Sequence, residues 1–380
     1  MELSVIMPCL NEVETLSDCI SKAKDAMSRN QVDGEVIIAD NGSVDGSVAV
    51  ARKAGASVII VAEKGYGSAL LGGIAGAQGR YIIMADADGS YDFGNLMPFL
   101  EKLREGYDLV MGNRFAGGIA PGAMPFMHRY LGNPVLTGIG RLFFDSSCHD
   151  FHCGMRGFSR VAINNLDLKT TGMEFASEMI VKATLQKLQI IEVPTTLSPD
   201  GRSRSPHLRT WRDGWRHLRF LLLYSPRWLF LYPGLTLVGI GVAVMAWLLP
   251  GPRSVAGITL DIHTLLYAAI AILIGVQAMF FSLFARVFTV TEGLLPSPSR
   301  LVLFARGMGL EHWLLAGGIC SGLGLAGSVR AVAVWQAVSF GPLDPVVTLR
   351  LVIPSALLLY LGGQLMLAGF FLGVLGMKRK

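Results

Sequence analysis

Charge is scarce in this sequence. Only 16% of its 380 residues are Asp, Glu, Lys or Arg, whereas 52% are hydrophobic. A single soluble globule rarely has this balance, so the composition favours a membrane protein. The scarcity is also uneven, because four stretches in the C-terminal part of the chain are almost free of charge. These stretches are 228–249, 264–285, 313–329 and 351–377.

Each stretch is near the length that a helix needs to cross a hydrocarbon core about 30 Å thick. The third is the shortest, but it continues past Arg330 into further apolar residues. The fourth is long enough to span with a tilt. We therefore predict an all-α membrane domain of four transmembrane helices over residues 228–380. A buried helical hairpin is the alternative for any one stretch.

Cysteine is scarce as well, with five residues in the chain, which fits a reducing compartment. Two of the cysteines enclose two histidines, and all four are residue types that bind zinc. No second cluster of such residues accompanies them, so the sequence gives a zinc site little support. The residues concerned are Cys9, Cys19, Cys148, His149, His152, Cys153 and Cys320.

Lys and Arg lie mainly on one side of the predicted spans, which orients the chain. The first residues, MELSVIMPCLNE, also lack the basic region and cleavage site of a secretory signal. Basic residues favour the cytoplasmic side, so we expect a multi-pass protein whose N-terminal part and C-terminus are cytoplasmic. The basic residues are Arg209, Arg212, Arg216, Arg219, Arg227, Arg286, Arg300, Arg306, Lys378, Arg379 and Lys380.

The N-terminal half alternates short apolar runs with helical patterns. Runs that are apolar throughout are typical of strands buried on both faces, and their alternation with helices predicts a mostly parallel sheet. Ligands bind such sheets at the carboxyl ends of the strands. The apolar runs are 3–7, 36–39, 57–61, 81–85 and 108–111, and the clearest helical patterns are 12–29 and 45–54.

Carboxylates follow three of these predicted strands. Glu12 comes soon after the first, Asp40 follows the second, and Asp86 and Asp88 follow the fourth. Two carboxylates at one strand end repel each other, and a bound cation offsets that cost. Asp45 is equally well explained as a helix cap or turn former.

A dinucleotide-binding domain is a competing interpretation, because Gly65-Tyr-Gly67-Ser-Ala-Leu70 begins like the GxGxxG fingerprint. The third glycine is absent. The motif also lies far from the first strand-to-helix turn, where the fingerprint belongs. Both departures argue against a nicotinamide or flavin enzyme.

The combined motifs resemble the family 2 glycosyltransferases with the A-type, Rossmann-like fold, such as dolichol-phosphate mannose synthase and bacterial polyprenyl-phosphate glucosyltransferases. The resemblance covers residues 1–205 and rests on VIMPCLNE, IIADNGSVDGS and ADADGSYD, together with the segments that contain Arg114, Arg156 and Glu178. The family usually has Asp-Asp at Asp40-Asn41 and a Thr-Ser pair at His152-Cys153. The resemblance implies a mixed-sheet α/β domain ahead of the membrane domain.

The resemblance also implies a set of site residues. Mg²⁺ or Mn²⁺ would be bound by Asp86 and Asp88 and would bridge the donor diphosphate. Asp88, Arg114 and Arg129 would be the catalytic residues. The acceptor phosphate would be bound by Arg114, Arg129 and Asn133, since guanidinium groups suit phosphate. The nucleotide-sugar would be bound by Pro8, Glu12, Asp40, Asp86, Asp88 and Arg202.

The implied reaction moves a hexose from UDP-glucose or GDP-mannose, with a slight preference for UDP-glucose, to undecaprenyl or dolichyl phosphate at the cytoplasmic membrane face. Direct attack would invert the anomeric carbon. The second pKa of a phosphate monoester is about 6, so the acceptor phosphate needs no strong base at neutral pH. Glu178 would either orient the acceptor or form a structural ion pair.

Residues 206–227 are predicted to form an amphipathic helix at the membrane interface. Arginines recur at Arg212, Arg216 and Arg219 on one face, and Trp211 and Trp215 recur on another. A second segment, 124–144, mixes aromatic and aliphatic residues with arginine. It is predicted to lie at the same interface, with an ordinary core helix as the alternative.

Two other classes of function compete with this hypothesis. A processive polysaccharide synthase would carry a QxxRW motif, but here Tyr224 stands in the glutamine's place before Arg227-Trp228. A non-catalytic scaffold or lipid carrier would not need the intact DxD and arginines. Glycine-rich spans permit packing within one chain or in a homo-oligomer. The basic residues gather at the membrane boundary, so we expect a lipid surface and no nucleic acid as partner.

Overall fold

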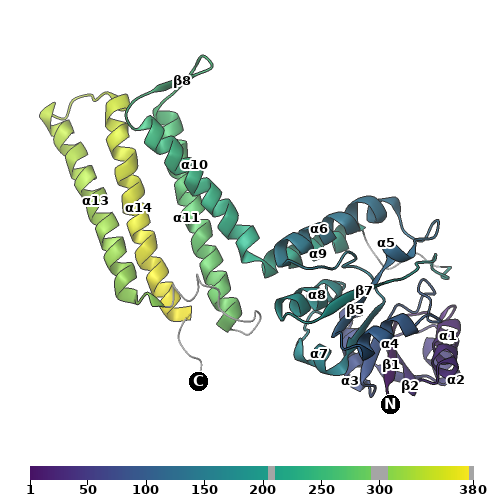
Figure 1. Ribbon diagram of the computed structural model, residues 1–380. Helices are drawn as coiled ribbons and strands as arrows, with labels where there is room; N and C mark the ends of the chain where they lie inside the picture. Colours follow the sequence, from purple (N-terminus) through teal and green to yellow (C-terminus); the bar gives the residue numbers. More distant parts are fainter. Residues whose placement is uncertain (204–209, 292–306, 376–380) are drawn as a thin grey trace. The chain divides into compact units, whose positions relative to one another are not determined.

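The computed structural model describes residues 1–203, 210–291 and 307–375 (Figure 1). They form two compact units, Met1–Tyr224 and Ser225–Lys380. Several of the predicted basic residues lie outside the described residues, namely Arg209, Arg300, Arg306, Lys378, Arg379 and Lys380.

A seven-stranded mixed sheet forms the centre of the first unit, in the order β3-β2-β1-β4-β6-β5-β7. Every pairing is parallel except those of β6, which runs antiparallel to β4 and β5. This confirms the predicted fold class. The strands are β1 (Leu3–Cys9), β2 (Gly34–Asp40), β3 (Ser57–Ile60), β4 (Tyr81–Met84), β5 (Leu109–Asn113), β6 (Arg156–Ser159) and β7 (Ile190–Pro194).

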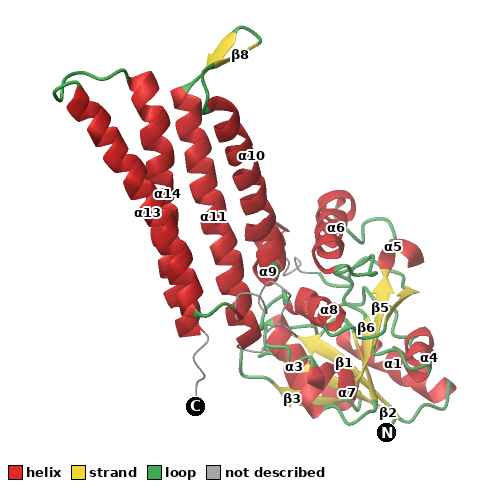
Figure 2. Ribbon diagram, turned by 60° about the vertical axis from the view of Figure 1, so that its left-hand side comes forward, coloured by secondary structure: helices red, strands yellow, loops and turns green. Residues whose placement is uncertain are grey.

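Helices cover both faces of this sheet (Figure 2). Side chains alternate between the faces, as a strand requires: Val5 and Met7 of β1 pack into one core, and Ile6 packs into the other. One face is covered by α1 (Leu16–Arg29), α2 (Ser47–Lys53) and α4 (Met97–Arg104). The other is covered by α3 (Tyr66–Gly76), α7 (Arg160–Asn165) and α8 (Phe175–Leu185).

A further group of helices packs at the carboxyl edge of the sheet. It consists of η1, a short π-helix (His128–Gly132), α6 (Asn133–Phe144) and α9 (Thr210–Tyr224), and the short helix α5 (Arg114–Gly117) lies nearby in the sequence. Phe144 of α6 and Phe220 and Leu221 of α9 share a core with Val181 of α8. The predicted interfacial helix therefore belongs to the first unit.

Helix α9 has a buried face that the sequence interpretation did not identify. Asp213, His217, Phe220 and Leu221 are buried. Trp211 is 80% exposed and Trp215 is 58% exposed. The helix thus combines one face packed on the protein with exposed tryptophans, which is suited to a membrane interface.

Four long apolar helices are described in the second unit, which confirms the predicted membrane domain. The helical stretches Arg227–Leu248, Ile262–Thr291, Leu310–Ala337 and Pro345–Leu375 are each long and apolar enough to cross a bilayer. The elements are η2 (Arg227–Leu231), α10 (Tyr232–Leu248), a hairpin of β8 (Arg253–Val255) and β9 (Ile258–Leu260), α11 (Ile262–Thr291), α13 (Leu310–Ala337) and α14 (Pro345–Leu375).

The glycine-rich segment of α13 packs within the chain. A Cβ added at Gly317 would lie 2.7 Å from the carbonyl oxygen of Gly362, and one at Gly324 would lie 2.7 Å from that of Ser355. Small residues let apolar helices approach closely, so these glycines serve the contact between α13 and α14.

Two glycines at the start of α3 have a packing role instead of the dinucleotide-binding role considered above. A Cβ at Gly65 or Gly67 would collide with the backbone oxygens of Thr171 and Thr170. The loop that carries these oxygens is held by Glu178, which is fully buried and accepts hydrogen bonds from the Lys169 and Thr170 amides at 3.1 and 2.8 Å.

Glu178 also forms an ion pair with Lys182 at 2.7 Å. Both carboxylate oxygens of Glu178 thus contact other groups of the protein. These contacts favour a structural ion pair for Glu178 over a role in orienting the acceptor.

We predict that Gly67→Ala lowers the free energy of unfolding by about 1–3 kcal/mol, because the methyl group overpacks a backbone contact. The matched control is Gly138→Ala in α6. Gly138 is exposed, and nothing lies within 4 Å of its added Cβ. Helix propensity should make the control neutral or stabilising by about 0.5–1 kcal/mol. Thermal unfolding of the detergent-purified variants measures both effects, and equal melting temperatures would contradict the assignment.

Candidate active site

A cleft of about 1270 Å³ lies at the carboxyl edge of the sheet. Because β1, β4 and β5 are parallel, the residues that follow them reach the same edge. Most of the predicted site residues line this cleft: Pro8, Glu12, Asp86, Asp88, Arg114, Asn133 and Arg202. Asp40 and Arg129 are not among its lining residues.

Asp86 and Asp88 follow β4 and lie in different surroundings. Asp88 Oδ1 accepts hydrogen bonds from the Ser90 amide at 3.0 Å and the Ser90 hydroxyl at 2.6 Å. The Tyr66 hydroxyl donates to Asp86 Oδ1 at 2.9 Å. Burial and the neighbouring charge of Asp88 raise the pKa of Asp86 to about 6. The two carboxylates thus repel each other in a partly desolvated site.

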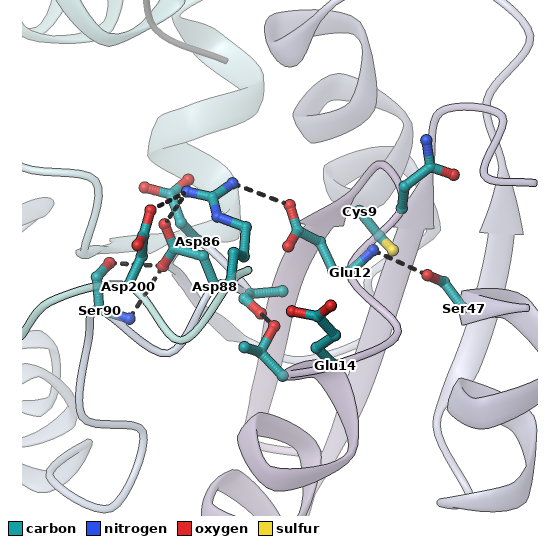
Figure 3. A network of polar contacts seen from close by, with 12 residues as sticks. Cys9, Glu12, Glu14, Ser47, Asp86, Asp88, Ser90 and Asp200 are labelled. Atoms are coloured by element: carbon teal, nitrogen blue, oxygen red, sulfur yellow. Dashed lines mark hydrogen bonds and ion pairs between the residues drawn. The ribbon is translucent and has the colours of Figure 1, made fainter. Parts of the chain in front are cut away.

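Arg202 provides the positive charge that offsets this repulsion. Its guanidinium contacts Asp88 Oδ2 at 2.7 Å, Glu12 Oε1 at 3.1 Å and Asp200 Oδ2 at 3.1 Å. Figure 3 shows Glu12, Asp88 and Asp200 converging on this point from separate segments. One arginine therefore holds three carboxylates together.

The donor set fits a hard divalent cation. Mg²⁺ and Mn²⁺ prefer oxygen ligands, and Mg²⁺ is commonly bound by one or two carboxylates plus substrate phosphates. Asp86 and Asp88 supply those carboxylates. Among the described residues no group of three His, Cys, Asp or Glu side chains is arranged to hold a metal ion.

Glu12 also borders a smaller recess of about 300 Å³, which lies beside Arg202 and is lined in part by Asn11, Val44 and Asp45. The Asp45 carboxylate accepts from the Ser47 amide at 3.0 Å and from the Val13 amide at 3.1 Å. Asp45 therefore fixes the walls of this recess.

Asp40 is buried, and its carboxylate accepts from the Gly42 amide at 3.0 Å and the Ser43 amide at 3.2 Å. In this structure it stabilises the turn that follows β2.

Arg114 lies deep in the cleft and is paired with a buried carboxylate. Its Nε and Nη2 atoms each donate to Asp150 at 2.7 Å, and its own amide also donates to Asp150. Asp150 is fully buried. This bidentate pair fixes the guanidinium and offsets much of its charge.

Arg129 and its neighbour His128 differ in their contact with the cleft. His128 lines the cleft. The Arg129 guanidinium lies over the Tyr130 ring, 5.5 Å from its centroid. Asn133, in the next helix, lines the cleft and donates to Met124 Sδ at 3.4 Å.

Three histidines and a further arginine line the cleft, and sequence reasoning assigned none of them to the site. They are His128, His152, His217 and Arg156. The rings of His152 and His217 are 4.5 Å apart. The sequence signals were that Arg156 lies in a segment that carries the resemblance, and that His152 replaces the threonine usual there.

The segment with two cysteines and two histidines is explained without zinc. Cys148 Sγ donates to Glu192 at 3.3 Å, and the His149 and Asp150 amides donate to the same carboxylate at 2.6 and 3.0 Å. Glu192 therefore organises the loop that carries Asp150 and His152.

The rest of the cleft is largely apolar. Helices η1 and α6 contribute Met127, Leu131, Val135 and Leu136, and α9 contributes Trp211 and Trp215. The cleft thus has an acidic end, where Asp86 and Asp88 follow β4, an apolar end at η1 and α6, and arginine and histidine side chains in its lining. It suits a ligand pair that has both charged and apolar parts.

Two family models match parts of the chain. A model of glycosyl transferase family 2 matches residues 4–167. A model of the family 2 C-terminal transmembrane region matches residues 283–376.

Among curated proteins, the hexosyltransferase Agl6 of low-salt glycan biosynthesis in Haloferax volcanii is 38% identical over 377 residues, which cover 98% of this chain and 89% of that protein. The glycosyltransferase AglJ of the same organism is 33% identical, over an alignment that covers 58% of this chain and 70% of AglJ. The dolichyl-phosphate hexose transferase of that organism is 28% identical, over an alignment that covers 51% of this chain and 81% of the transferase.

A solved structure with a similar fold is glucosyl-3-phosphoglycerate synthase from Mycobacterium tuberculosis, with a TM-score of 0.46, 20% identity and coverage of 59% of this chain and 80% of the synthase. The family assignment rests on the matched family models and on the near full-length similarity to Agl6. The chain therefore belongs to glycosyltransferase family 2, as an integral membrane member with a C-terminal transmembrane region.

Proposed function

We propose that this chain transfers a hexose from a nucleoside diphosphate sugar to the phosphate of a polyprenyl phosphate. The observation that carries the proposal is the cleft that holds Asp86, Asp88 and Arg202 together with further arginines and an apolar end. A nucleotide-sugar and a polyprenyl phosphate together carry the charged, polar and apolar groups that such a lining suits.

The acidic end suits the donor. Asp86 and Asp88 would bind Mg²⁺ or Mn²⁺, which supplies charge neutralisation for the departing diphosphate. Glu12 borders the recess beside Arg202, where its carboxylate would accept hydrogen bonds from ribose or base. Arg202 would turn from the carboxylates to the diphosphate. Pro8 would form part of the wall.

The acceptor needs positioning more than it needs a base. Its phosphate oxygen would attack the anomeric carbon with a lone pair, and the bond from that carbon to the diphosphate oxygen would break with its electrons leaving on the nucleotide. The configuration at the anomeric carbon would be inverted. Arg114 and Asn133, both in the cleft, are the residues that we assign to holding the phosphate.

The apolar end suits an isoprenoid chain. Met127, Leu131 and Val135 line it, and the exposed Trp211 and Trp215 offer an anchor at the lipid headgroups. The names of the relatives support this class, since Agl6 is a hexosyltransferase and another relative is a dolichyl-phosphate hexose transferase. UDP-glucose and GDP-mannose are the donors to test first.

We predict that Asp88→Asn lowers kcat by about a hundredfold or more, because charge neutralisation of the leaving group is worth several kcal/mol. Radiolabelled UDP- and GDP-sugars, purified protein, Mg²⁺ or Mn²⁺, and undecaprenyl or dolichyl phosphate provide the assay. Asp92→Asn is the matched control, because Asp92 lies in the same loop, is exposed and only accepts from the Gly94 amide. Full activity of folded Asp88→Asn would remove Asp88 from catalysis.

A second prediction concerns Arg202, whose guanidinium contacts Asp88 at 2.7 Å and would compete with a cation. Arg202→Gln should bind Mn²⁺ about tenfold more tightly without nucleotide, which corresponds to about 1.4 kcal/mol. The same variant should have a higher donor KM, since it loses a cation for the diphosphate. Paramagnetic resonance of free Mn²⁺ measures the first effect. Weaker Mn²⁺ binding by the variant would contradict the competition.

The third prediction is that the first unit and the C-terminus face the cytoplasm, as the arginines of the α9 segment, Arg212, Arg216 and Arg219, favour. A reporter fused after the last residue should give a cytoplasmic signal in cells. A signal from the opposite side of the membrane would exclude the proposed orientation.

A further inference from the structure

The ring of His152 lacks hydrogen-bond partners in the described part of the chain. Both of its ring nitrogens are buried, and neither bonds to another group there. An unsatisfied buried polar atom costs about 1–3 kcal/mol, so the two ring nitrogens are suited to a polar partner that enters the cleft. The residue lines the cleft.

The surroundings of His152 are cationic. Arg156 is fully buried and donates only to neutral groups, among them the backbone oxygens of Cys153, Ala176 and Phe151 at 2.8, 2.6 and 2.8 Å. No described carboxylate forms an ion pair with it. A buried cation without a paired anion is costly, and it attracts an anion into the adjacent cavity.

The surroundings of His152 and His217 favour the neutral form of both rings. Burial, His217, Arg114 and Arg156 lower the pKa of His152 far below its ordinary value, and burial lowers the pKa of His217 to about 4. A neutral imidazole still offers one N–H donor. His217 is oriented by Ser177, whose hydroxyl lies 2.8 Å from Nδ1.

We propose that His152 binds the phosphate monoester of the acceptor, in a subsite that His217 and the buried charge of Arg156 complete. The inference rests on the function proposed above and extends it by naming a phosphate-binding residue that the family motif does not supply. The subsite also supplies phosphate contacts that Arg129 does not, because Arg129 lies over Tyr130 and is not among the cleft-lining residues, whereas His152 and His217 are.

A phosphate fits this subsite better than a sugar hydroxyl does. Besides burial, two permanent cations, Arg114 and Arg156, are among the groups that lower the pKa of His152. The nearby carboxylates Glu174 and Asp213 act on His217, where they oppose the lowering of its pKa by burial. None of the causes of the His152 shift is a carboxylate.

The test replaces His152 by phenylalanine, which keeps a ring against His217 and removes both nitrogens. Loss of one hydrogen bond to a charged group should raise the acceptor KM about ten- to a hundredfold while the donor KM stays unchanged. The melting temperature should stay equal or rise, because two unsatisfied buried atoms are removed. A purely structural histidine would give the opposite pattern, with lower stability and an unchanged acceptor KM.

Two further variants keep the test decisive. His152→Gln, which restores an N–H donor, should recover part of the acceptor affinity, and it replaces the phenylalanine variant if that one does not fold. His149→Phe is the matched control, because His149 lies in the same loop, is exposed and does not line the cleft. It gives up the contact of its ring with Glu192 at 2.9 Å, so it reports what a loss of loop contacts alone does to the acceptor KM. A changed donor KM with an unchanged acceptor KM in His152→Phe would overturn the proposal in favour of a sugar contact.

Direct binding separates this inference from the proposed function. Tryptophan fluorescence, which Trp211 and Trp215 in the cleft should report, is titrated with citronellyl phosphate, citronellol and inorganic phosphate. Binding of citronellyl phosphate that His152→Phe weakens, with little response to citronellol, supports a phosphate subsite for a lipid ligand. An equal response to inorganic phosphate would make the source free phosphate and would overturn the assignment to the acceptor.

The two proposals can fail separately. Wild-type protein that binds citronellyl phosphate through His152 but transfers no sugar to polyprenyl phosphate would retain the subsite and refute the proposed function. Transfer to polyprenyl phosphate with an unchanged acceptor KM in His152→Phe would retain the function and refute the subsite.

Discussion

The convergence of carboxylates at one edge of the sheet is the constraint on which the rest of the site depends. Parallel strands β1 and β4 deliver Glu12, Asp86 and Asp88 to the same place, and their mutual repulsion must be offset. Arg202 offsets it in the described structure through contacts with Glu12, Asp88 and Asp200. When a metal ion and a diphosphate bind, the metal would take the place of the Arg202 guanidinium beside the carboxylates. Donor binding would then keep the charge of the carboxylates balanced.

Two carboxylates that do not line the cleft, Glu178 and Glu192, hold the loops that pack against this edge of the sheet. Glu178 holds the loop at Thr170, the loop packs on the glycines that begin α3, and Tyr66 of α3 donates to Asp86. Glu192 holds the loop at His149 in the same way, and that loop carries Asp150, the partner of Arg114. Glu178, which is fully buried, and Glu192, which is partly buried, thus hold the loops that support the cleft.

The sequence predicted the sheet, the four spans and the carboxylates because each has a local signal. An apolar run followed by Asp86 and Asp88 needs no tertiary information to interpret. The antiparallel strand β6 has no such local signal. Nor does the position of the Arg129 side chain, because Arg129 lies in the π-helix η1, which helical periodicity does not anticipate. His152 was visible only as a departure from the resembled motif. Its lack of hydrogen-bond partners depends on burial by α8 and α9, which follow it in the chain.

The central claim is that the sugar is attached to a lipid phosphate, and the chemical identity of the product tests it most directly. Purified protein is given a nucleotide-sugar and equal amounts of a polyprenyl phosphate and the corresponding polyprenol, and the lipid products are identified by mass spectrometry. The account predicts a product of polyprenyl phosphate plus one hexose, with the anomeric configuration inverted and with formation abolished by a chelator. Hexose attached to the polyprenol, or a product with retained configuration, would contradict it.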